Sequence, residues 1–122
     1  GYGGDAAAKA TFRAMFDVLK PGGILGLVDH RWPDPKTEDP AAANGYISED
    51  RVIELVTEAG FNLVERSDMH HNSKDSHNHP RGVWTLPPSL AMGDVDRDKY
   101  ITIGESDRMT LKFRKPAKPM PE

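Results

Sequence analysis

The sequence contains no cysteine and no long apolar run, and each absence excludes a class of structure. Without cysteine, the chain can form neither a disulfide nor a metal site built on thiolates. A helix that crosses a membrane needs about 20 consecutive apolar residues, and no stretch of the sequence approaches that length. We therefore expect no membrane as a partner, while the lack of cysteine leaves the cellular compartment open.

A strong charge of either sign is also missing. The formal net charge is −3, with 29% of the residues charged, which gives no reason to expect a nucleic acid as a partner. The length of 122 residues suits one domain. Apolar residues make up only 37%, and most of the ten prolines follow residue 32. We therefore predict one α/β domain over residues 1–116, with an irregular loop over 67–107 and a flexible tail over 117–122.

The stretch over residues 17–30 organises the rest of the chain. Pro21 cannot continue a helix, and the two glycines after it permit the positive φ of a tight turn. The run over 24–28 is almost wholly apolar, which is typical of a strand buried on both faces of a parallel sheet. Ligands bind beyond the carboxyl ends of such strands, so we expect the chemistry near Asp29 and His30.

Two helices are predicted, one before this strand and one after it. Residues 5–19 carry apolar side chains at helical spacing, with Asp5 as the N-cap. Residues 48–59 repeat the pattern, with Ser48 as the N-cap and Gly60 in the left-handed position that ends a helix. The apolar positions are Ala8, Phe12, Met15, Phe16 and Leu19 in the first helix, and Val52, Ile53, Leu55, Val56 and Ala59 in the second.

Two further strands are predicted at 61–66 and 109–114, where apolar and polar residues alternate. The proline-containing segment 31–44 is a loop, and short helical turns are expected at 89–92 and 96–100. The first two strands and the helix between them predict a right-handed crossover, with the two strands parallel. The last two strands need no helix between them, so we expect them to pair antiparallel.

Asp29 and His30 are the candidate catalytic residues. The pKa of histidine lies near neutrality, so His30 can take a proton from a nucleophile beside Asp29. Arg31 and Trp84 are the candidate substrate-binding residues, because a guanidinium binds anionic groups and a loop tryptophan can line a pocket. Each of these residues also has a structural alternative. Asp29 would be a capping residue, His30 a surface side chain, Arg31 a solvated one, and Trp84 would fill the gap between loop and sheet. We expect this packing role for Trp32.

Histidines are concentrated in the irregular loop. One residue separates His77 from His79, a spacing that can bind zinc, nickel or copper, and Asp75 lies nearby. No regular structure is predicted to fix these side chains, so the alternative is a polar lid or an ordinary surface loop. We expect no metal centre, and His77 and His79 are the candidate ligands if one forms. The residues before the last strand form either an ion-pair network or part of the site: Glu105, Asp107 and Arg108.

Two junctions resemble landmarks of the class I S-adenosylmethionine-dependent methyltransferases. They are the Leu-Lys-Pro-Gly-Gly turn at 19–23 and the Glu-Ala-Gly-Phe junction at 58–61, each just before a predicted strand. A closer similarity, to a bacterial branch of predicted methyltransferases, is carried by residues 3–9, 28–31, 82–88 and 104–113. The resemblance is to the C-terminal half of the fold and extends over essentially the whole chain.

The resemblance implies a partial Rossmann-like three-layer sandwich, in which this chain supplies strands five to seven and the last strand is antiparallel. It also implies S-adenosylmethionine as the cofactor, at a site that is incomplete here. The family's glycine-rich loop follows its first strand, and no strand precedes the glycines of residues 1–4. The outer edge of strand five would be bare and apolar, so we expect a second copy of the chain, or a missing N-terminal half, to cover it.

Two functions follow from these observations. The first is the substrate-side portion of an S-adenosylmethionine-dependent methyltransferase that acts on a small molecule. The alternative is a non-catalytic fragment, or an assembly or ligand-binding module, that keeps the fold and binds metal through its histidine-rich loop. The chain opens on Gly1 rather than methionine, so we expect residues upstream of it. The resemblance is compatible with either the cytoplasm or the periplasm.

Overall fold

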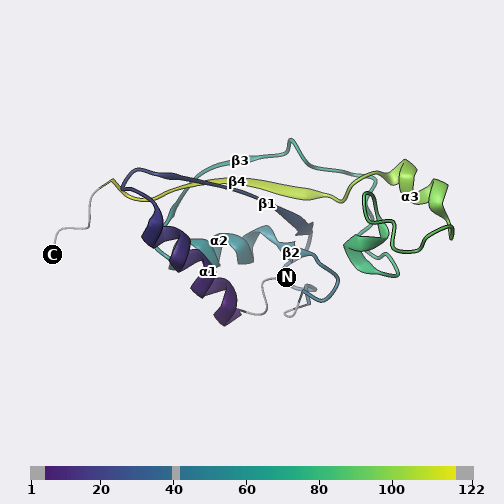
Figure 1. The fold of residues 1–122 in the computed structure, drawn as a ribbon, viewed down its shortest axis with the longest axis horizontal. Coiled ribbons are helices and arrows are strands. Elements are labelled where there is room, and N and C mark those ends of the chain that lie inside the picture. The colour runs from purple at the N-terminus through teal and green to yellow at the C-terminus, as the bar shows by residue number, and fades with distance from the viewer. Residues whose placement is uncertain (1–4, 40–41, 118–122) are drawn as a thin grey trace.

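Four strands form a curled mixed sheet in the order β2-β1-β4-β3, and three α-helices accompany it (Figure 1). The computed structural model describes residues 5–39 and 42–117. No helix in this part of the chain is long and apolar enough to cross a membrane. The elements in chain order are α1 (Asp5–Val18), β1 (Ile24–Trp32), β2 (Ile47–Ser48), α2 (Glu49–Glu58), β3 (Asn62–Ser67), the 3-10 helix η1 (Gly82–Thr85), α3 (Arg97–Ile103) and β4 (Arg108–Arg114).

The last strand lies in the middle of the sheet. β4 pairs antiparallel with β1 on one side and with β3 on the other. β1 and β3 are therefore parallel to each other, as the crossover predicted, although they are not neighbours. The expected antiparallel pairing of the last two strands is confirmed. β2 adds only a short parallel pairing at the end of β1, where Arg31 faces Ile47.

The two predicted helices form close to the expected positions. Ser48 caps α2, and its hydroxyl accepts a hydrogen bond from the backbone N–H of Arg51 at 3.2 Å. Gly60 follows α2 with a φ of +115°, and a Cβ there would lie 2.7 Å from the ring of Phe16. Only glycine satisfies both the backbone angle and the close approach. The predicted cap at Asp5 lies outside the residues whose side chains are described.

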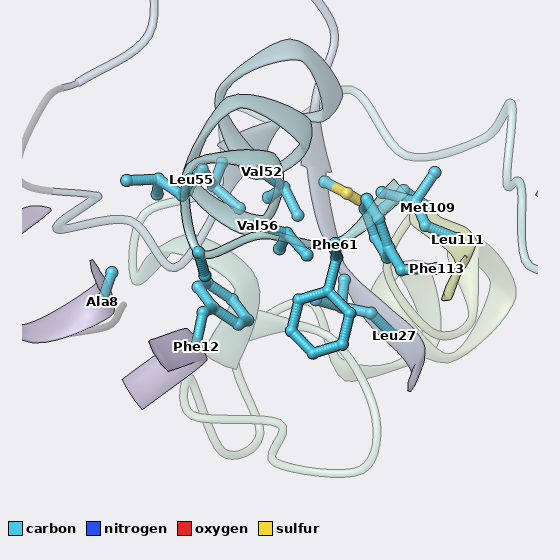
Figure 2. Packing of buried hydrophobic residues seen from close by; sticks show 12 residues of the cluster. Ala8, Phe12, Leu27, Val52, Leu55, Val56, Phe61, Met109, Leu111 and Phe113 are labelled. Atoms are coloured by element: carbon cyan, nitrogen blue, oxygen red, sulfur yellow. The ribbon is translucent and has the colours of Figure 1, made fainter. Parts of the chain in front are cut away.

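The core lies between the sheet and one layer of helices. Helices α1 and α2 both lie on the same side of the sheet (Figure 1), and Figure 2 shows their side chains directed toward those of the strands. Met15 does not join this core and is partly exposed. The buried cluster contains Ala8, Phe12, Leu27, Ile47, Val52, Leu55, Val56, Ala59, Phe61, Met109, Leu111 and Phe113.

The prediction that β1 is buried on both faces is wrong. Ile24 and Val28 are each 48% exposed, and a Cβ placed on Gly26 between them would meet no atom within 4 Å. The reason is that both helices that pack on the sheet use the opposite face. The described residues therefore form two layers, where the sequence predicted three. We call the uncovered side of β1 the open face of the sheet.

Several boundaries also differ from the sequence prediction. β1 continues to Trp32, because backbone pairing with β4 and β2 extends it beyond the apolar run. Helix η1 was not predicted, and α3 is longer than the turn expected at 96–100. Lys115 follows β4 and is held in place, since its backbone pairs with that of Gly22 and Gly23 and its Nζ donates to two carbonyls at the end of α1. Most of the predicted tail, residues 118–122, lies outside the described residues.

Candidate functional site

Asp29 and His30 lie within β1 rather than beyond it. Successive side chains of a strand point to opposite faces, so the two residues do not face each other. Their contact is local, because the Asp29 carboxylate accepts a hydrogen bond from the backbone N–H of His30 at 2.7 Å. His30 faces Arg108 in the register with β4. The structure thus separates the two predicted catalytic side chains and places His30 beside Arg108.

His30 forms a hydrogen bond with a serine that sequence reasoning did not select. Its Nδ1 lies 2.5 Å from Oγ of Ser106, and the ring tautomer decides which of the two groups donates. The ring also lies edge-on to that of Tyr46, with 6.4 Å between centroids. Burial lowers the pKa of His30 from its ordinary value of 6.5, and the nearby positive charge of Arg108 acts in the same direction. The imidazole is therefore neutral at neutral pH.

A small pocket opens beside this pair, with a volume of about 180 Å³. Trp84, on η1, contributes to its wall and is 46% exposed. Arg108 also lines the pocket, and its Nε atom is buried without a hydrogen-bond partner among the described residues. The full lining consists of His30, Val83, Trp84, Pro87, Pro88, Ser89, Glu105, Ser106 and Arg108. Of the four residues predicted for catalysis or substrate binding, His30 and Trp84 line this pocket, whereas Asp29 and Arg31 do not.

Arg31 lies in an ion-pair cluster and does not line the pocket. Its guanidinium contacts Asp107 at 2.9 Å and Glu49 at 3.1 Å. The hydrogen bond with Asp107 raises the pKa of Arg31. Because the guanidinium is held between two carboxylates, its first role in this fold is to join β1 to α2 and to the loop before β4. The solvated side chain that the sequence offered as the alternative does not match this placement. The substrate role of Arg31 stays a prediction.

Two buried aspartates hold the histidine-rich loop. Asp75 accepts hydrogen bonds from the hydroxyl of Tyr46 at 2.8 Å and from the backbone N–H of Asp107 at 2.9 Å. His79 contacts Asp75 at 2.7 Å, whereas His77 contacts Asp107 at 3.1 Å. Burial alone would raise the pKa of both carboxyls, but the hydrogen bonds that they accept outweigh burial and lower it. Burial and the contact with Asp75 raise the pKa of Tyr46.

The metal candidates are not supported. His77 and His79 point to different carboxylates, and within residues 5–39 and 42–117 no group of three or more histidine, aspartate or glutamate side chains is placed to hold a metal ion. The loop instead packs against the sheet, where the ring of His77 contacts those of Trp32 and Tyr46. The expectation that Trp32 serves packing is thereby confirmed.

The described residues do not fit the cofactor that the sequence implied. In the Rossmann-type arrangement a glycine-rich turn joins the end of a strand to a helix and brings the backbone close to the cofactor. Here the glycines of the two family-like junctions, Gly22 and Gly60, stand before strands rather than after them. The segment after β1 contains proline and aspartate, and β2 runs directly into α2. No step of the chemistry is therefore assigned to S-adenosylmethionine.

Comparison with known proteins shows a likeness at the level of fold. No family model matches the sequence, and no curated protein matches it. The crystal structure of SpnF, a [4+2]-cyclase, matches with a TM-score of 0.56 and 19% sequence identity, over 90% of this chain and 44% of that chain. The chain therefore spans less than half the length of this neighbour. At this identity the likeness shows the fold alone and no specific function.

These findings contradict the identification of the chain as the C-terminal half of a class I methyltransferase. No family model or curated protein supports it, and the structural neighbour bears the name of a cyclase. The error has a physical reason. The landmarks at Gly22 and Gly60 are turns that place a glycine at positive φ between a helix and a strand. Such turns specify local backbone geometry, which many unrelated functions share.

Sequence reasoning missed Ser106 as a partner of His30. These residues are 76 positions apart, and β4 brings them together because it inserts between β1 and β3. The weak signal that existed was the position of Ser106 just before the last predicted strand. Arg108, which the sequence assigned to either the site or an ion-pair network, lines the pocket and pairs with Glu105 at 3.5 Å.

Proposed function

We propose that this chain is the substrate-binding side of an enzyme that acts on a small molecule bearing a hydroxyl group, with His30 as the proton acceptor. The observation that carries the proposal is the contact of His30 with Ser106 inside a pocket that Trp84 also lines. Because the imidazole is neutral at neutral pH, it can accept a proton from a bound hydroxyl. A volume of about 180 Å³ suits the hydroxyl-bearing end of a small molecule.

The proton transfer requires one particular tautomer of His30. Nδ1–H donates to Oγ of Ser106, which leaves the lone pair of Nε2 as the acceptor. The substrate O–H bond breaks, an N–H bond forms at Nε2, and the electron pair stays on the substrate oxygen. Arg108 lines the same pocket, and its positive charge favours this developing anion. Ser106 orients the base, and Arg108 stabilises the oxygen.

Methyl transfer is the group-transfer reaction to test first on this oxygen, because the likeness to SpnF offers a weak link to a methyltransferase-like fold. The proposal assigns to this chain only the binding of the molecule that accepts the methyl group, because the described residues of the chain do not fit the methyl donor. Calorimetric titration with S-adenosylhomocysteine addresses the donor side. Micromolar binding would mean that the chain takes up the donor by itself. The absence of binding heat would assign the donor to residues outside the described chain or to a partner.

The proton-acceptor role is tested by nuclear magnetic resonance of the histidine rings, with phenol as an uncharged hydroxyl probe. We expect phenol to shift the ring signals of His30 and to leave those of His70 in place, because His70 does not line the pocket. Ser106→Ala should change the tautomer balance of His30 while leaving the fold intact. A His30 ring that does not respond to phenol, or that titrates above 6.5, would contradict the proposal.

A second candidate function, that of an assembly module, is favoured by the outer edge of β1. From Ile24 to His30 this strand pairs only with β4 among the described residues, so its other edge has no strand partner. The open face beside it carries the exposed Ile24 and Val28. Unpaired strand edges with apolar side chains recruit further strands. We propose a second copy of this chain as the occupant, paired edge to edge about a two-fold axis.

A further inference from the structure

Trp84 separates two pockets rather than closing one. It lines the pocket of His30 and also a second, more open pocket of about 610 Å³. With 46% of its surface exposed, it is the only residue of η1 that is not buried. A large aromatic ring that stays exposed between two hollows offers a flat surface against which a planar ligand can stack. The two pockets can therefore bind two ends of one molecule.

The backbone that carries Trp84 is held on both sides of this residue. Gly82 has a φ of +59°, and a Cβ there would lie 2.4 Å from the carbonyl oxygen of Asn44. Val83 donates its backbone N–H to the same carbonyl at 2.9 Å, and the hydroxyl of Thr85 accepts from the backbone N–H of Arg81 at 2.9 Å. Because the backbone on both sides of Trp84 is fixed, little ordering is needed when a ligand binds.

The second pocket contains a cation that the fold does not use. Arg81 lines this pocket, and its guanidinium forms no ion pair or hydrogen bond with any described residue. Asp39 and His79, which also line the second pocket, each have a partner within the chain. Asp39 accepts a hydrogen bond from the backbone N–H of Ala43, and His79 contacts Asp75. A free guanidinium beside an aromatic surface recognises a carboxylate or a similar planar anion.

We propose that the two pockets form one binding site for a planar aromatic molecule with a hydroxyl group at one end and a carboxylate at the other. The hydroxyl lies beside His30, the ring stacks on Trp84, and the carboxylate pairs with Arg81. The inference rests on the proposed role of His30 for the hydroxyl end and adds the substrate class. Arg81 and Trp84 are binding residues here and take no part in the proton transfer.

The experiment uses the full chain with Trp32 replaced by phenylalanine, so that Trp84 is the only tryptophan. The probes are para-hydroxybenzoate and the longer para-hydroxycinnamate. Their amides are the uncharged controls, and the saturated cyclohexane analogue is the non-planar control. We expect the carboxylates to quench Trp84 fluorescence. Arg81→Gln should weaken the binding of the carboxylates about tenfold and leave that of the amides nearly unchanged, because only the charged pair is lost.

The matched control is Arg97→Gln, which removes the same charge from an exposed position of α3, outside both pockets. Equal losses in the two variants would mean that Arg81 acts through bulk charge, and they would overturn the inference. Equal binding of acid and amide, tight binding of the saturated analogue, or no quenching by either carboxylate would also overturn it. The phenol response of His30 does not involve Arg81, so a failure of the proposed function would be seen separately in that ring.

Discussion

Arg31 and Asp107 form a forked ion pair that joins β1 to the loop before β4. Nε of Arg31 lies 3.2 Å from Oδ2 of Asp107, and Nη2 lies 2.9 Å from Oδ1. The Asp107 side chain is only 3% exposed and that of Arg31 15%. Two parallel charge-assisted hydrogen bonds at low exposure hold both groups in a single geometry. This pair fixes the end of β1 that presents His30 to the pocket.

Asp107→Asn should destabilise the protein strongly. Removing one partner of a buried pair leaves Arg31 without its main counter-charge, which typically costs about 3–5 kcal/mol. Urea unfolding followed by circular dichroism measures the loss. Asp94→Asn is the control, because Asp94 is exposed and belongs to no ion pair among the described residues. A loss below about 1 kcal/mol, the range of surface ion pairs, would show that the fork is not important for stability.

Stability should fall in acid, and Asp75 and Asp107 should account for much of the fall. The pKa of each carboxyl is lowered in the folded chain from an ordinary value of 3.8. Below that value the unfolded chain binds protons that the folded chain does not, so the free energy of unfolding decreases with falling pH. The stabilisation is complete above pH 3.8 and is lost as the pH falls through the folded pKa. Urea midpoints across the acid range should drop less steeply in Asp107→Asn, and an unchanged slope would contradict this assignment.

His30 should make its own contribution to the pH dependence at mildly acidic pH. Its pKa is lowered in the folded chain, so the neutral ring is the form that folding favours. The contribution of His30 to the free energy of unfolding is fully present above the unfolded pKa of 6.5, and it decreases as the pH falls below 6.5 towards the folded pKa. The variant His30→Gln should have a flatter stability profile between pH 6.5 and the folded pKa. A profile identical to that of the parent protein would show that the ring titrates normally.

Gly82→Ala should disturb Trp84 more than a glycine substitution usually does. The new Cβ would collide with the Asn44 carbonyl at 2.4 Å, in addition to the strain of a φ of +59°. Gly93 provides a close control, with a φ of +62° and no atom within 4 Å of an added Cβ. We expect Gly93→Ala to lose about 1 kcal/mol and Gly82→Ala at least twice that, with a shift in Trp84 fluorescence for Gly82→Ala alone. Equal effects would show that η1 adjusts freely.

The edge of β1 should support self-association. If a second copy pairs there, light scattering at increasing concentration should detect a dimer, and Val28→Lys should weaken it by placing a charge on the open face. Ile101→Lys is the matched control, because Ile101 is equally exposed but lies on α3. A monomer at every concentration would exclude the second copy as the occupant of this edge.

Much of the secondary structure could be predicted because it is encoded locally. Helix α2 follows from a cap at Ser48 and a glycine at position 60, and both act within a few residues of the helix ends. Strand β4 follows from simple alternation, since Met109, Leu111 and Phe113 are buried while Lys112 is exposed. These patterns depend only on the neighbours of a residue along the chain, so they can be recognised without knowledge of the fold.

The site could be predicted only in part. His30 and Trp84 were selected from their positions near a strand end and in a loop, and both line the pocket. Arg31 was selected on the same grounds, yet it pairs with Asp107 because β4 brings that carboxylate beside β1. Ser106 and Arg81 gave no distinct local pattern, since a serine before a strand and an arginine in a loop are common.

The sequence by itself determined where helices and strands begin and which side chains are apolar, because caps, turns and alternation act over a few residues. Only the tertiary structure decided that both helices pack on one face, that His30 meets Ser106 across 76 positions, and that the histidine loop is held by two buried aspartates. The contact of His30 with Ser106 depends on the insertion of β4 between β1 and β3. That pairing is long-range, and no local pattern encodes which distant side chains it brings into contact.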